Sequence, residues 1–416
     1  MKSKLRSGLI AALDVGTTKV CCFIARGQDD GTLKILGIGH QLSRGIRGGA
    51  VVDMDEAEHS IRAAVDAAEQ MAGERIDEVV VNVTGGTPNS HNLKVDLGLN
   101  GHPIDDGDIG RLLDHGRHHS SVGPERETIH VVPTGFAVDG NEGIRDPRGM
   151  FGQKLSVALH MISAAPGPLR NLATVVSRCH LGIEARVVSS YCSGLACLVE
   201  DEKELGVTCI DMGGGTTSMA VFLGGELVHT DVIAVGGHHV TNDIARGLST
   251  PLAHAERMKT LYGSAMPSPS DDRDILAVPL VGEDEDGQAN QLPRSMLVQI
   301  IKPRLEETFE LVRSHLESGG FDKLAGRRVV LTGGGSQMQG VRDLAALILD
   351  KQVRMGRPVG LLGLAEATGG PAFSTCAGLL RFALHHHTER PANASRGSEN
   401  PGTMLGRLGH WIRKNF

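Results

Sequence analysis

The sequence predicts an α/β protein with two similar halves, mainly because two short glycine-rich loops lie far apart in the chain. Residues 14–19 have the sequence Asp-Val-Gly-Thr-Thr-Lys, and residues 211–217 have the sequence Asp-Met-Gly-Gly-Gly-Thr-Thr. An apolar run precedes each loop and another follows it, which is typical of the tight turn of a β-hairpin. Each hairpin would carry an acid at the mouth of its turn, and we expect the two turns to face each other.

The residue types in both loops suit a phosphate group. Glycines allow backbone N–H groups to close around an anion, and threonine hydroxyls add donors. A carboxylate beside such a nest does not bind phosphate, but it can hold Mg²⁺, usually through water. One such loop is more often only a structural turn, whereas two facing copies would clamp a phosphate chain. The clamp would contain Asp14, Gly16, Thr17, Thr18, Lys19, Asp211, Gly213, Gly214, Gly215, Thr216 and Thr217.

A third glycine-rich segment supports this interpretation. An expected buried strand is followed by three glycines and then by a helix from about Val341. No Lys-Ser or Lys-Thr follows these glycines, and the G-x-G-x-x-G spacing is absent, so neither common phosphate motif is present. Glycines after a strand let a flat base or ribose lie against bare backbone; the alternative is an ordinary strand-to-helix turn. The candidates here are Gly333, Gly334, Gly335, Ser336 and Met338.

Two residues of opposite charge lie between the second and third loops. Glu256 and Lys259 are three positions apart in a polar helical stretch, so they share a helix face. They would hold the ribose hydroxyls and the edge of the base, or they form only an exposed salt bridge.

The order of these motifs resembles the superfamily of actin, the heat-shock chaperones and the sugar kinases. The resemblance implies an actin-like ATPase fold, with two RNase H-like halves around a cleft that holds ATP and Mg²⁺. It places Lys19 on the phosphates and gives Asp14 and Asp211 the catalytic role of positioning the water shell of Mg²⁺. Residues 189–196 and 373–380 are rich in small side chains and fit the superfamily's interdomain helices, which cross closely.

Within the superfamily, the chain resembles the FtsA family of bacterial cell-division proteins from about residue 8 to residue 384. Matching stretches include residues 45–53, 235–245 and 301–307, and the second of these contributes Gly237 to the nucleotide site. The resemblance implies a protein that polymerises and anchors the FtsZ ring to the inner membrane. It would act on the cytoplasmic face at the division site and recruit later division proteins.

The resemblance and the hydrophobic pattern together divide the chain. An inserted α+β subdomain for protein contacts is expected at residues 85–161, with strands near 93–97, 130–138 and 154–162 and a helix from about 105 to 119. A helix over residues 55–71 would be capped by Asp53. The other expected parts are a first core subdomain (1–84 and 162–204), a second core subdomain (205–244 and 303–387), an upper subdomain for nucleotide and FtsZ contacts (245–302), a flexible linker (388–402) and an amphipathic helix (403–416).

Composition excludes several function classes. The chain has 416 residues, a net charge of −7 and 3% aromatic residues, which argue against a nucleic-acid binder. No apolar run approaches the roughly 18 residues of a membrane span, and the basic N-terminus does not fit a signal peptide. The seven cysteines lack metal-ligand spacing and indicate reduced, buried thiols. The histidine pairs at 118–119 and 238–239 and the run at 385–387 depart from the family pattern, and we expect them on the solvated surface.

A predicted amphipathic helix over residues 300–316 carries Lys302 and Arg304 near its expected start. The helix dipole disfavours cations at that place, which hints at an acidic ligand. In FtsA-like proteins this subdomain docks the acidic tail peptide of FtsZ. Arg304 is therefore the candidate partner contact, and the alternative is an ordinary surface cation.

The last residues of the chain have the pattern of a helix that binds a membrane surface. At about 100° per residue, Met404, Leu405, Leu408, Trp411, Ile412 and Phe416 share one arc, and Arg407, Arg413 and Lys414 lie opposite. The chain's only tryptophan is among them, where its ring suits a lipid interface. Two glycines would leave this segment mostly unfolded in water, so one tail would attach weakly to anionic lipid and many tails on a polymer would attach firmly. The alternative is a helix packed on the globular body.

Two other functions remain open. A small-molecule kinase of the same superfamily would need a catalytic aspartate and a polar sugar pocket, and neither is evident. A pilus-assembly actin-like scaffold shares the loops, although the tail and the region around Arg304 favour FtsA. No glutamine or glutamate that positions an attacking water is identified, so hydrolysis is expected to be slow at most and the nucleotide to act mainly as an assembly switch.

Overall fold

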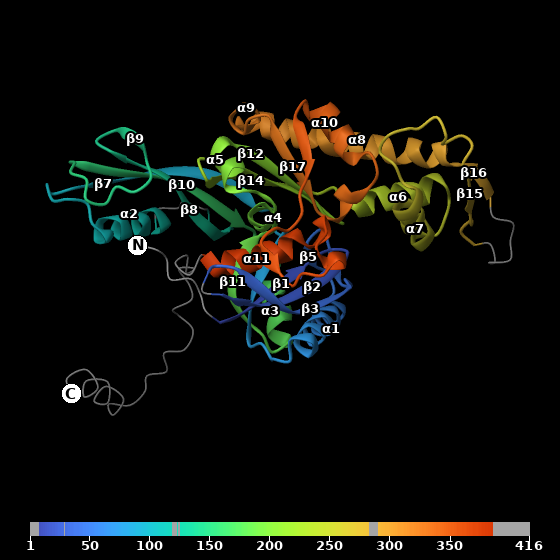
Figure 1. Ribbon diagram of the computed structural model, residues 1–416, viewed down its shortest axis with the longest axis horizontal. Coiled ribbons are helices and arrows are strands. Elements are labelled where there is room, and N and C mark those ends of the chain that lie inside the picture. The colour runs from blue at the N-terminus through green and yellow to red at the C-terminus, as the bar shows by residue number, and fades with distance from the viewer. Residues whose placement is uncertain (1–7, 29, 119–122, 124, 283–289, 386–416) are drawn as a thin grey trace.

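Two open β-sheets with helices between them form the body of the protein, and a lobe extends from each end of the upper sheet (Figure 1). This computed structural model describes residues 8–28, 30–118, 123, 125–282 and 290–385. The predicted linker at 388–402 and the predicted helix at 403–416 lie outside the described residues.

The first half is built on a six-stranded sheet with the order β11-β6-β1-β2-β3-β19. Strands β1 to β3 form an antiparallel meander, and β6 and β11 continue the sheet as parallel strands. Helices α1 and α3 cover one face, and Asp53 caps α1 by accepting hydrogen bonds from the backbone of Asp55 and Glu56, as predicted. The elements are β1 (Leu9–Val15), β2 (Lys19–Gly27), β3 (Leu33–Leu42), a small hairpin of β4 (Ile46–Arg47) and β5 (Ala50–Val51), α1 (Met54–Ala72), β6 (Glu78–Val83), α3 (Pro166–Arg178), β11 (Gly182–Val188) and β19 (Leu361–Leu362).

The second half repeats this topology in the order β14-β13-β12-β17-β18. Strands β12 to β14 form an antiparallel meander, and β17 and β18 are parallel, so the prediction of two similar halves is confirmed. The elements are α5 (Glu200–Leu205), β12 (Val207–Met212), β13 (Thr217–Leu223), β14 (Glu226–Ile233), α8 (Arg294–Ser318), α9 (Phe321–Leu324), β17 (Arg328–Thr332), η1 (Gly334–Gln337), α10 (Val341–Leu349), β18 (Gln352–Met355), η2 (Glu366–Thr368) and η3 (Pro371–Phe373).

Two buried helices, α4 (Ser189–Cys197) and α11 (Ser374–His385), lie between the two sheets and share one hydrophobic core with both. They approach so closely that a Cβ atom on Gly378 would lie 1.8 Å from the carbonyl oxygen of Cys192. Only glycine fits at such a contact, so the close helix crossing predicted from the small residues is confirmed.

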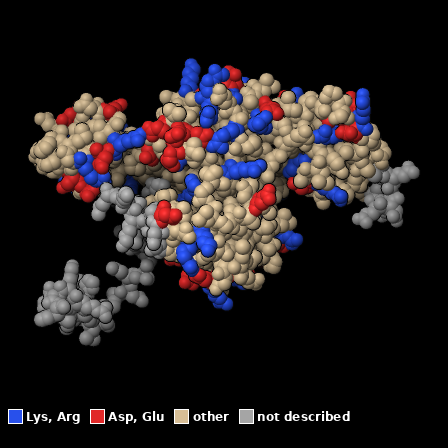
Figure 2. All heavy atoms as spheres, viewed as in Figure 1, with Lys and Arg blue, Asp and Glu red and all other residues tan. Residues whose placement is uncertain are grey.

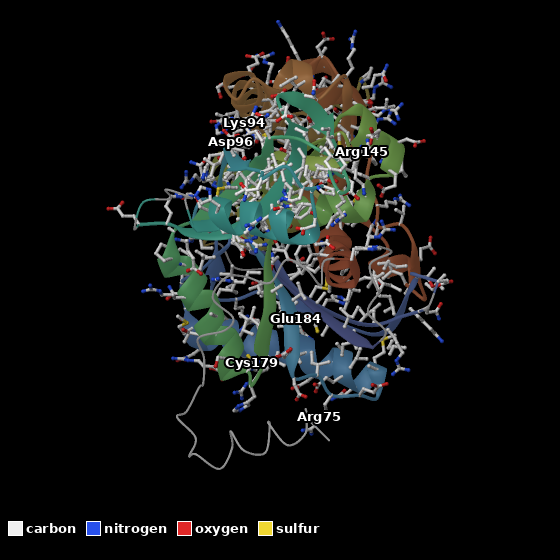
Figure 3. The ribbon with its side chains drawn as sticks, turned by 90° about the vertical axis from the view of Figure 1, so that its left-hand side faces the viewer. Arg75, Lys94, Asp96, Arg145, Cys179 and Glu184 are labelled. Atoms are coloured by element: carbon white, nitrogen blue, oxygen red, sulfur yellow. The ribbon has the colours of Figure 1, made fainter. Side chains whose placement is uncertain are left out.

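The lobe at one end is the predicted insert. It consists of a four-stranded antiparallel sheet with the order β7-β10-β8-β9 and one helix. Two ion pairs link its strands, Lys94 Nζ with Glu142 Oε1 at 2.9 Å and Lys154 Nζ with Asp96 Oδ2 at 2.7 Å; Figure 3 labels Lys94 and Asp96 on this side of the molecule. Its elements are β7 (Asn89–Gly98), α2 (Asp106–His118), β8 (Glu127–Val138), β9 (Asn141–Ile144) and β10 (Lys154–Ala164). The three predicted strands are confirmed with longer bounds and the predicted helix with slightly shorter ones, whereas β9 was not predicted.

The lobe at the opposite end contains α6 (Gly237–Gly247), α7 (Leu252–Tyr262), β15 (Ile275–Val278), β16 (Asn290–Pro293) and the first part of α8 (Figure 1). Helix α8 begins at Arg294 rather than near residue 300, because Pro293 holds an extended backbone and ends β16 just before it. Lys302 and Arg304 therefore lie well inside the helix, so their predicted position at its start is wrong and the helix dipole does not disfavour them there. The Arg304 guanidinium is also paired within the chain: its Nε donates to Asp243 Oδ2 at 2.6 Å, and it contacts Glu307.

The surface agrees with the sequence in two respects. Lysine and arginine are interspersed with aspartate and glutamate over the visible face, without one large field of a single sign (Figure 2). Within the described residues, no helix combines the length and the apolar character that crossing a bilayer requires.

Candidate functional site

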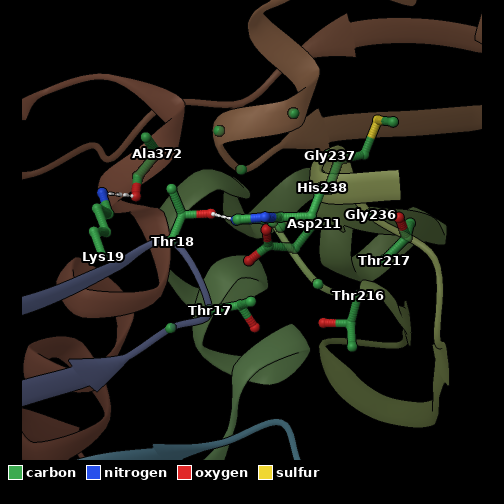
Figure 4. Close-up of a pocket in the computed structure, with 18 of the residues that line it drawn as sticks. Thr17, Thr18, Lys19, Asp211, Thr216, Thr217, Gly236, Gly237, His238 and Ala372 are labelled. Carbon is green, nitrogen blue, oxygen red and sulfur yellow. Dashed lines mark hydrogen bonds between the residues drawn. The ribbon is translucent and has the colours of Figure 1, made fainter. Parts of the chain in front are cut away.

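The predicted loops converge on a cavity of about 430 Å³ where the two halves meet. The first loop joins β1 to β2, the second joins β12 to β13, the third follows β17, and α7 contributes two charged side chains. Figure 4 labels residues of the first two loops, among them Thr18 and Asp211. The predicted residues that line the cavity are Asp14, Gly16, Thr17, Thr18, Lys19, Asp211, Gly213, Gly214, Gly215, Thr216, Thr217, Gly237, Glu256, Lys259, Gly333, Gly334, Gly335 and Met338. Ser336 is the one predicted residue that does not line it.

The first two loops close in the same way. The backbone N–H of Gly16 donates to the carbonyl oxygen of Lys19 at 3.0 Å, and that of Gly213 donates to the carbonyl oxygen of Thr216 at 2.9 Å. A Cβ atom at Gly16 or Gly213 would crowd the same carbonyl oxygen, at 2.9 and 3.1 Å respectively. Equivalent glycines therefore allow equivalent turns in the two halves, and the hairpin prediction is confirmed for both.

Each hairpin buries its acid at the floor of the cavity. Asp14 and Asp211 are only 7% and 8% exposed. Burial raises the pKa of Asp14 from 3.8 to about 7; the Lys19 charge opposes this rise and the Asp211 charge adds to it. Burial also raises the pKa of Asp211, although hydrogen bonds from Ser193 and Thr375 oppose the rise. Two buried carboxylates with raised pKa values, one of them raised in part by the charge of the other, favour a bound cation, so these residues fit the Mg²⁺ implied by the sequence.

The sequence did not indicate which residues hold the acids in place. The Thr375 hydroxyl donates to Asp211 Oδ2 at 3.0 Å, and the Ser193 hydroxyl donates to the same oxygen. Asn82 accepts a hydrogen bond from the Val15 backbone at 2.7 Å and so fixes the end of β1. Ser193 and Thr375 lie in the two small-residue segments that predicted the helix crossing, but nothing in those segments showed that their hydroxyls meet Asp211.

The charged pair on α7, Glu256 and Lys259, lies in the part of the cavity wall that the second half of the protein forms. Lys259 Nζ contacts Glu256 Oε2 at 2.7 Å, Thr241 Oγ1 at 2.9 Å and the carbonyl oxygen of Gly237 at 3.1 Å. Burial acts to raise the pKa of Glu256, but hydrogen bonds from Lys259 and Thr241 outweigh it and hold that pKa below its usual value. The Glu256 carboxylate is thus ionised and the pair is fixed at the cavity, and its contact with ribose and base stays a prediction.

Two predicted residues are oriented differently from the expectation. Lys19 Nζ donates to the carbonyl oxygen of Ala372 and lies 3.3 Å from the ring centroid of Phe373, so it points away from the second loop (Figure 4). Its cation is attracted by an aromatic face that the sequence places far away. Ser336 is buried, and its hydroxyl donates to the carbonyl oxygen of Gly333 at 2.8 Å. It stabilises the third turn from beneath instead of facing the cavity.

His238 is the main lining residue that the sequence argument missed. It was expected on the solvated surface, and it is solvent-accessible, but within the cavity. Its Nε2 lies 3.2 Å from the Thr18 hydroxyl on the opposite half (Figure 4). Its neighbour His239 is also engaged, since its Nδ1 accepts a hydrogen bond from the Gly236 backbone at 3.1 Å. The sequence signal that could have placed this pair at the cavity was its position directly after Gly236 and Gly237.

Comparison with known proteins identifies the family. Residues 208–378 match the family model described as cell division protein FtsA, and residues 85–163 match the SHS2 domain inserted in FtsA. The chain is 43% identical to the cell division protein FtsA of Rhizobium meliloti (strain 1021), over 99% of this chain and 96% of that protein. It is 32% identical to the cell division protein FtsA of Escherichia coli (strain K12), over 98% of each.

This chain belongs to the FtsA family of cell-division proteins.

Solved structures show the same fold class. The chain resembles a chain of the PilM–PilN type IV pilus biogenesis complex with a TM-score of 0.66 and 16% identity, over 91% of this chain and 99% of that chain. It resembles MreB5 of Spiroplasma citri bound to ADP with a TM-score of 0.50 and 14% identity, over 90% of this chain and 95% of that chain. The fold is therefore the predicted actin-like one, with the SHS2 insert that marks the FtsA family.

Proposed function

We propose that this FtsA-family chain binds Mg·ATP in the cleft and uses it to control its own assembly into polymers that hold the FtsZ ring at the inner membrane. The observation that carries the proposal is the pair of equivalent glycine turns, each with a buried acid, on opposite walls of one cavity. Solved structures of the fold relative MreB5 are described as bound to ADP and to AMPPNP, which supports a nucleotide as the ligand.

The cleft residues divide into two groups by chemistry. Asp14 and Asp211 would hold the water shell of Mg²⁺, while the turn glycines and threonines would donate to phosphate oxygens. Glu256 and Lys259, with the third turn and Met338, would hold the nucleoside. When bound between these groups, Mg²⁺ would supply charge that neutralises the phosphates and the two acids.

We further propose that hydrolysis is slow. The sequence motifs identify no glutamine or glutamate that positions an attacking water, so the nucleotide would act as a switch more than as a substrate. A turnover above about 10 s⁻¹, the median for ordinary enzymes, would contradict this part of the proposal.

The overall shape suits an assembling subunit. The insert and the lobe of α6, α7, β15 and β16 lie at opposite ends of the long axis, so one subunit offers two separate contact regions (Figure 1). We propose that these regions serve polymer contacts, later division proteins and the FtsZ tail. Because Arg304 is already paired with Asp243, an acidic FtsZ peptide would have to replace that carboxylate at this position.

Membrane attachment would come from residues 403–416 acting together on a polymer. Each cation of the tail contributes about 1 kcal/mol against anionic lipid, so one tail binds reversibly. Many tails on one polymer multiply this weak binding. Localisation at the inner membrane would therefore depend on assembly and hence on the nucleotide.

Co-sedimentation with anionic phospholipid vesicles tests the proposal. The full chain should pellet with vesicles in the presence of Mg·ATP and much less without nucleotide. Trp411→Glu should abolish vesicle binding, whereas the matched Trp411→Phe should retain it because the ring still enters the interface. Undiminished co-sedimentation of Trp411→Glu would refute the role of residues 403–416 as a membrane anchor. Vesicle binding that is the same with and without nucleotide would refute the role of the nucleotide as an assembly switch.

A further inference from the structure

One contact spans the cleft between the two halves of the phosphate clamp. Thr18 Oγ1 and His238 Nε2 are 3.2 Å apart, although the residues are 220 positions apart in the chain. Thr18 belongs to the first glycine turn, and His238 is near the start of α6, in the second half. We call this hydrogen bond the clasp.

The second glycine turn holds the histidine against the first. The backbone N–H of His238 donates to the carbonyl oxygen of Gly214 at 2.7 Å. A Cβ atom on Gly214 would lie 1.9 Å from Thr18 Oγ1 and 3.0 Å from His238 Cδ2. The clasp therefore occupies the narrow space between the two turns, where a phosphate chain held by both would have to pass.

The position of His238 along the cleft also points to the inner phosphates. Gly237, its neighbour, accepts a hydrogen bond from Lys259, which is one of the two residues that we propose to hold the nucleoside. A Cβ atom on Gly215, further along the second turn, would instead lie 2.6 Å from Thr17 Oγ1. His238 thus lies between the nucleoside residues and the far end of the clamp.

Few basic groups are available at this place. Of the described residues that line the cavity, only Lys19, His238 and Lys259 are basic. Lys19 is turned toward Ala372 and Phe373, and Lys259 is bound to Glu256. His238 is the basic group that bridges the two turns themselves.

We propose that His238 is a phosphate ligand: the clasp with Thr18 closes the cleft without nucleotide, and an inner phosphate shared by ADP and ATP replaces the clasp when nucleotide binds. This inference rests on the proposed nucleotide-binding function and adds to it one residue and the part of the ligand that it contacts. In the bound state, the Thr18 hydroxyl and the imidazole each donate to the phosphate, which compensates for the hydrogen bond that they lose to each other.

Equilibrium titration of the full chain with a fluorescent ATP analogue, followed by competition with ATP, ADP and adenosine in Mg²⁺, tests the proposal. His238→Ala should weaken ATP and ADP about tenfold or more, as expected for a hydrogen bond to a charged group. Adenosine should compete within about twofold of wild type. His238→Asn keeps a donor and should recover part of the loss, and His254→Ala, which removes an exposed histidine on α7 outside the cavity, should change nothing.

Each other outcome has a definite meaning. An equal loss for all three ligands would show a structural role, a loss for ATP alone would place His238 at the terminal phosphate, and no loss would remove it from the site. Any of these overturns the proposal while leaving nucleotide binding intact. If wild type binds neither ATP nor ADP, the proposed function fails as well.

Discussion

Replacing Asp14 by asparagine should stabilise the nucleotide-free protein and at the same time weaken its binding of Mg·ATP. Asp14 is buried at the cleft floor with Asp211 nearby, and its pKa is raised from 3.8 to about 7. Asparagine has nearly the same shape as the protonated acid but carries no charge to bury. The substitution therefore removes the destabilising ionisation without leaving a cavity.

The magnitude follows from the change in pKa. An acid with a raised folded pKa binds more protons in the folded state than in the unfolded state between the two pKa values, so wild-type stability falls as the pH rises from 3.8 to about 7. A shift of roughly 3 pH units corresponds to about 4 kcal/mol. Asp14→Asn should thus raise the free energy of unfolding by about 4 kcal/mol at pH 8 and by about 2 kcal/mol at pH 5.

Urea unfolding of both proteins at pH 8 and pH 5, in EDTA, measures this difference. In a second series without EDTA, saturating Mg·ATP should stabilise wild type by about 3 kcal/mol at 100 times its Kd and leave Asp14→Asn nearly unchanged. A variant that is less stable than wild type, or a gain that does not depend on pH, would refute the assignment of a buried ionised acid.

Three further predictions concern other parts of the chain. Gly378→Ala should cost at least about 3 kcal/mol in urea unfolding, because its Cβ would lie 1.8 Å from the Cys192 carbonyl oxygen; a cost below about 1 kcal/mol would contradict the close helix crossing. Burial lowers the pKa of His160 to about 3 from 6.5, so wild type should lose stability as the pH falls below 6.5. His160→Gln should reduce that loss by about 2 kcal/mol between pH 7 and pH 5, and parallel curves would contradict it. Lys259→Met should weaken ATP, ADP and adenosine about equally in the competition assay, and a loss confined to the phosphorylated ligands would remove Lys259 from the nucleoside end.

The sequence predicted correctly those elements whose formation depends on residues close together in the chain or on residue size alone. The hairpin at residues 14–19 has apolar strands on both sides and a glycine where a side chain would crowd the turn. Helix α1 has an aspartate cap and an apolar face. The crossing of α4 and α11 was evident because small residues are needed wherever two backbones meet.

What the sequence could not provide depends on contacts between distant segments. Lys19 turns toward Phe373 because folding brings an aromatic ring within reach. His238 was predicted on the solvated surface because its sequence neighbours do not show that folding places it opposite Thr18. Ser336 was predicted to contact the ligand, but it is buried beneath the third turn and donates to the Gly333 carbonyl oxygen. The start of α8 was misplaced because Pro293 was not recognised as the residue that ends β16.

Calorimetric titration of the full chain with ATP is the most direct test of the central claim, that the two acid-bearing turns form one Mg·ATP site. We predict a single site per chain that loses most of its affinity when EDTA removes Mg²⁺ or when Asp211 is replaced by asparagine. Absence of ATP binding, or binding that is indifferent to both Mg²⁺ and Asp211, would contradict it.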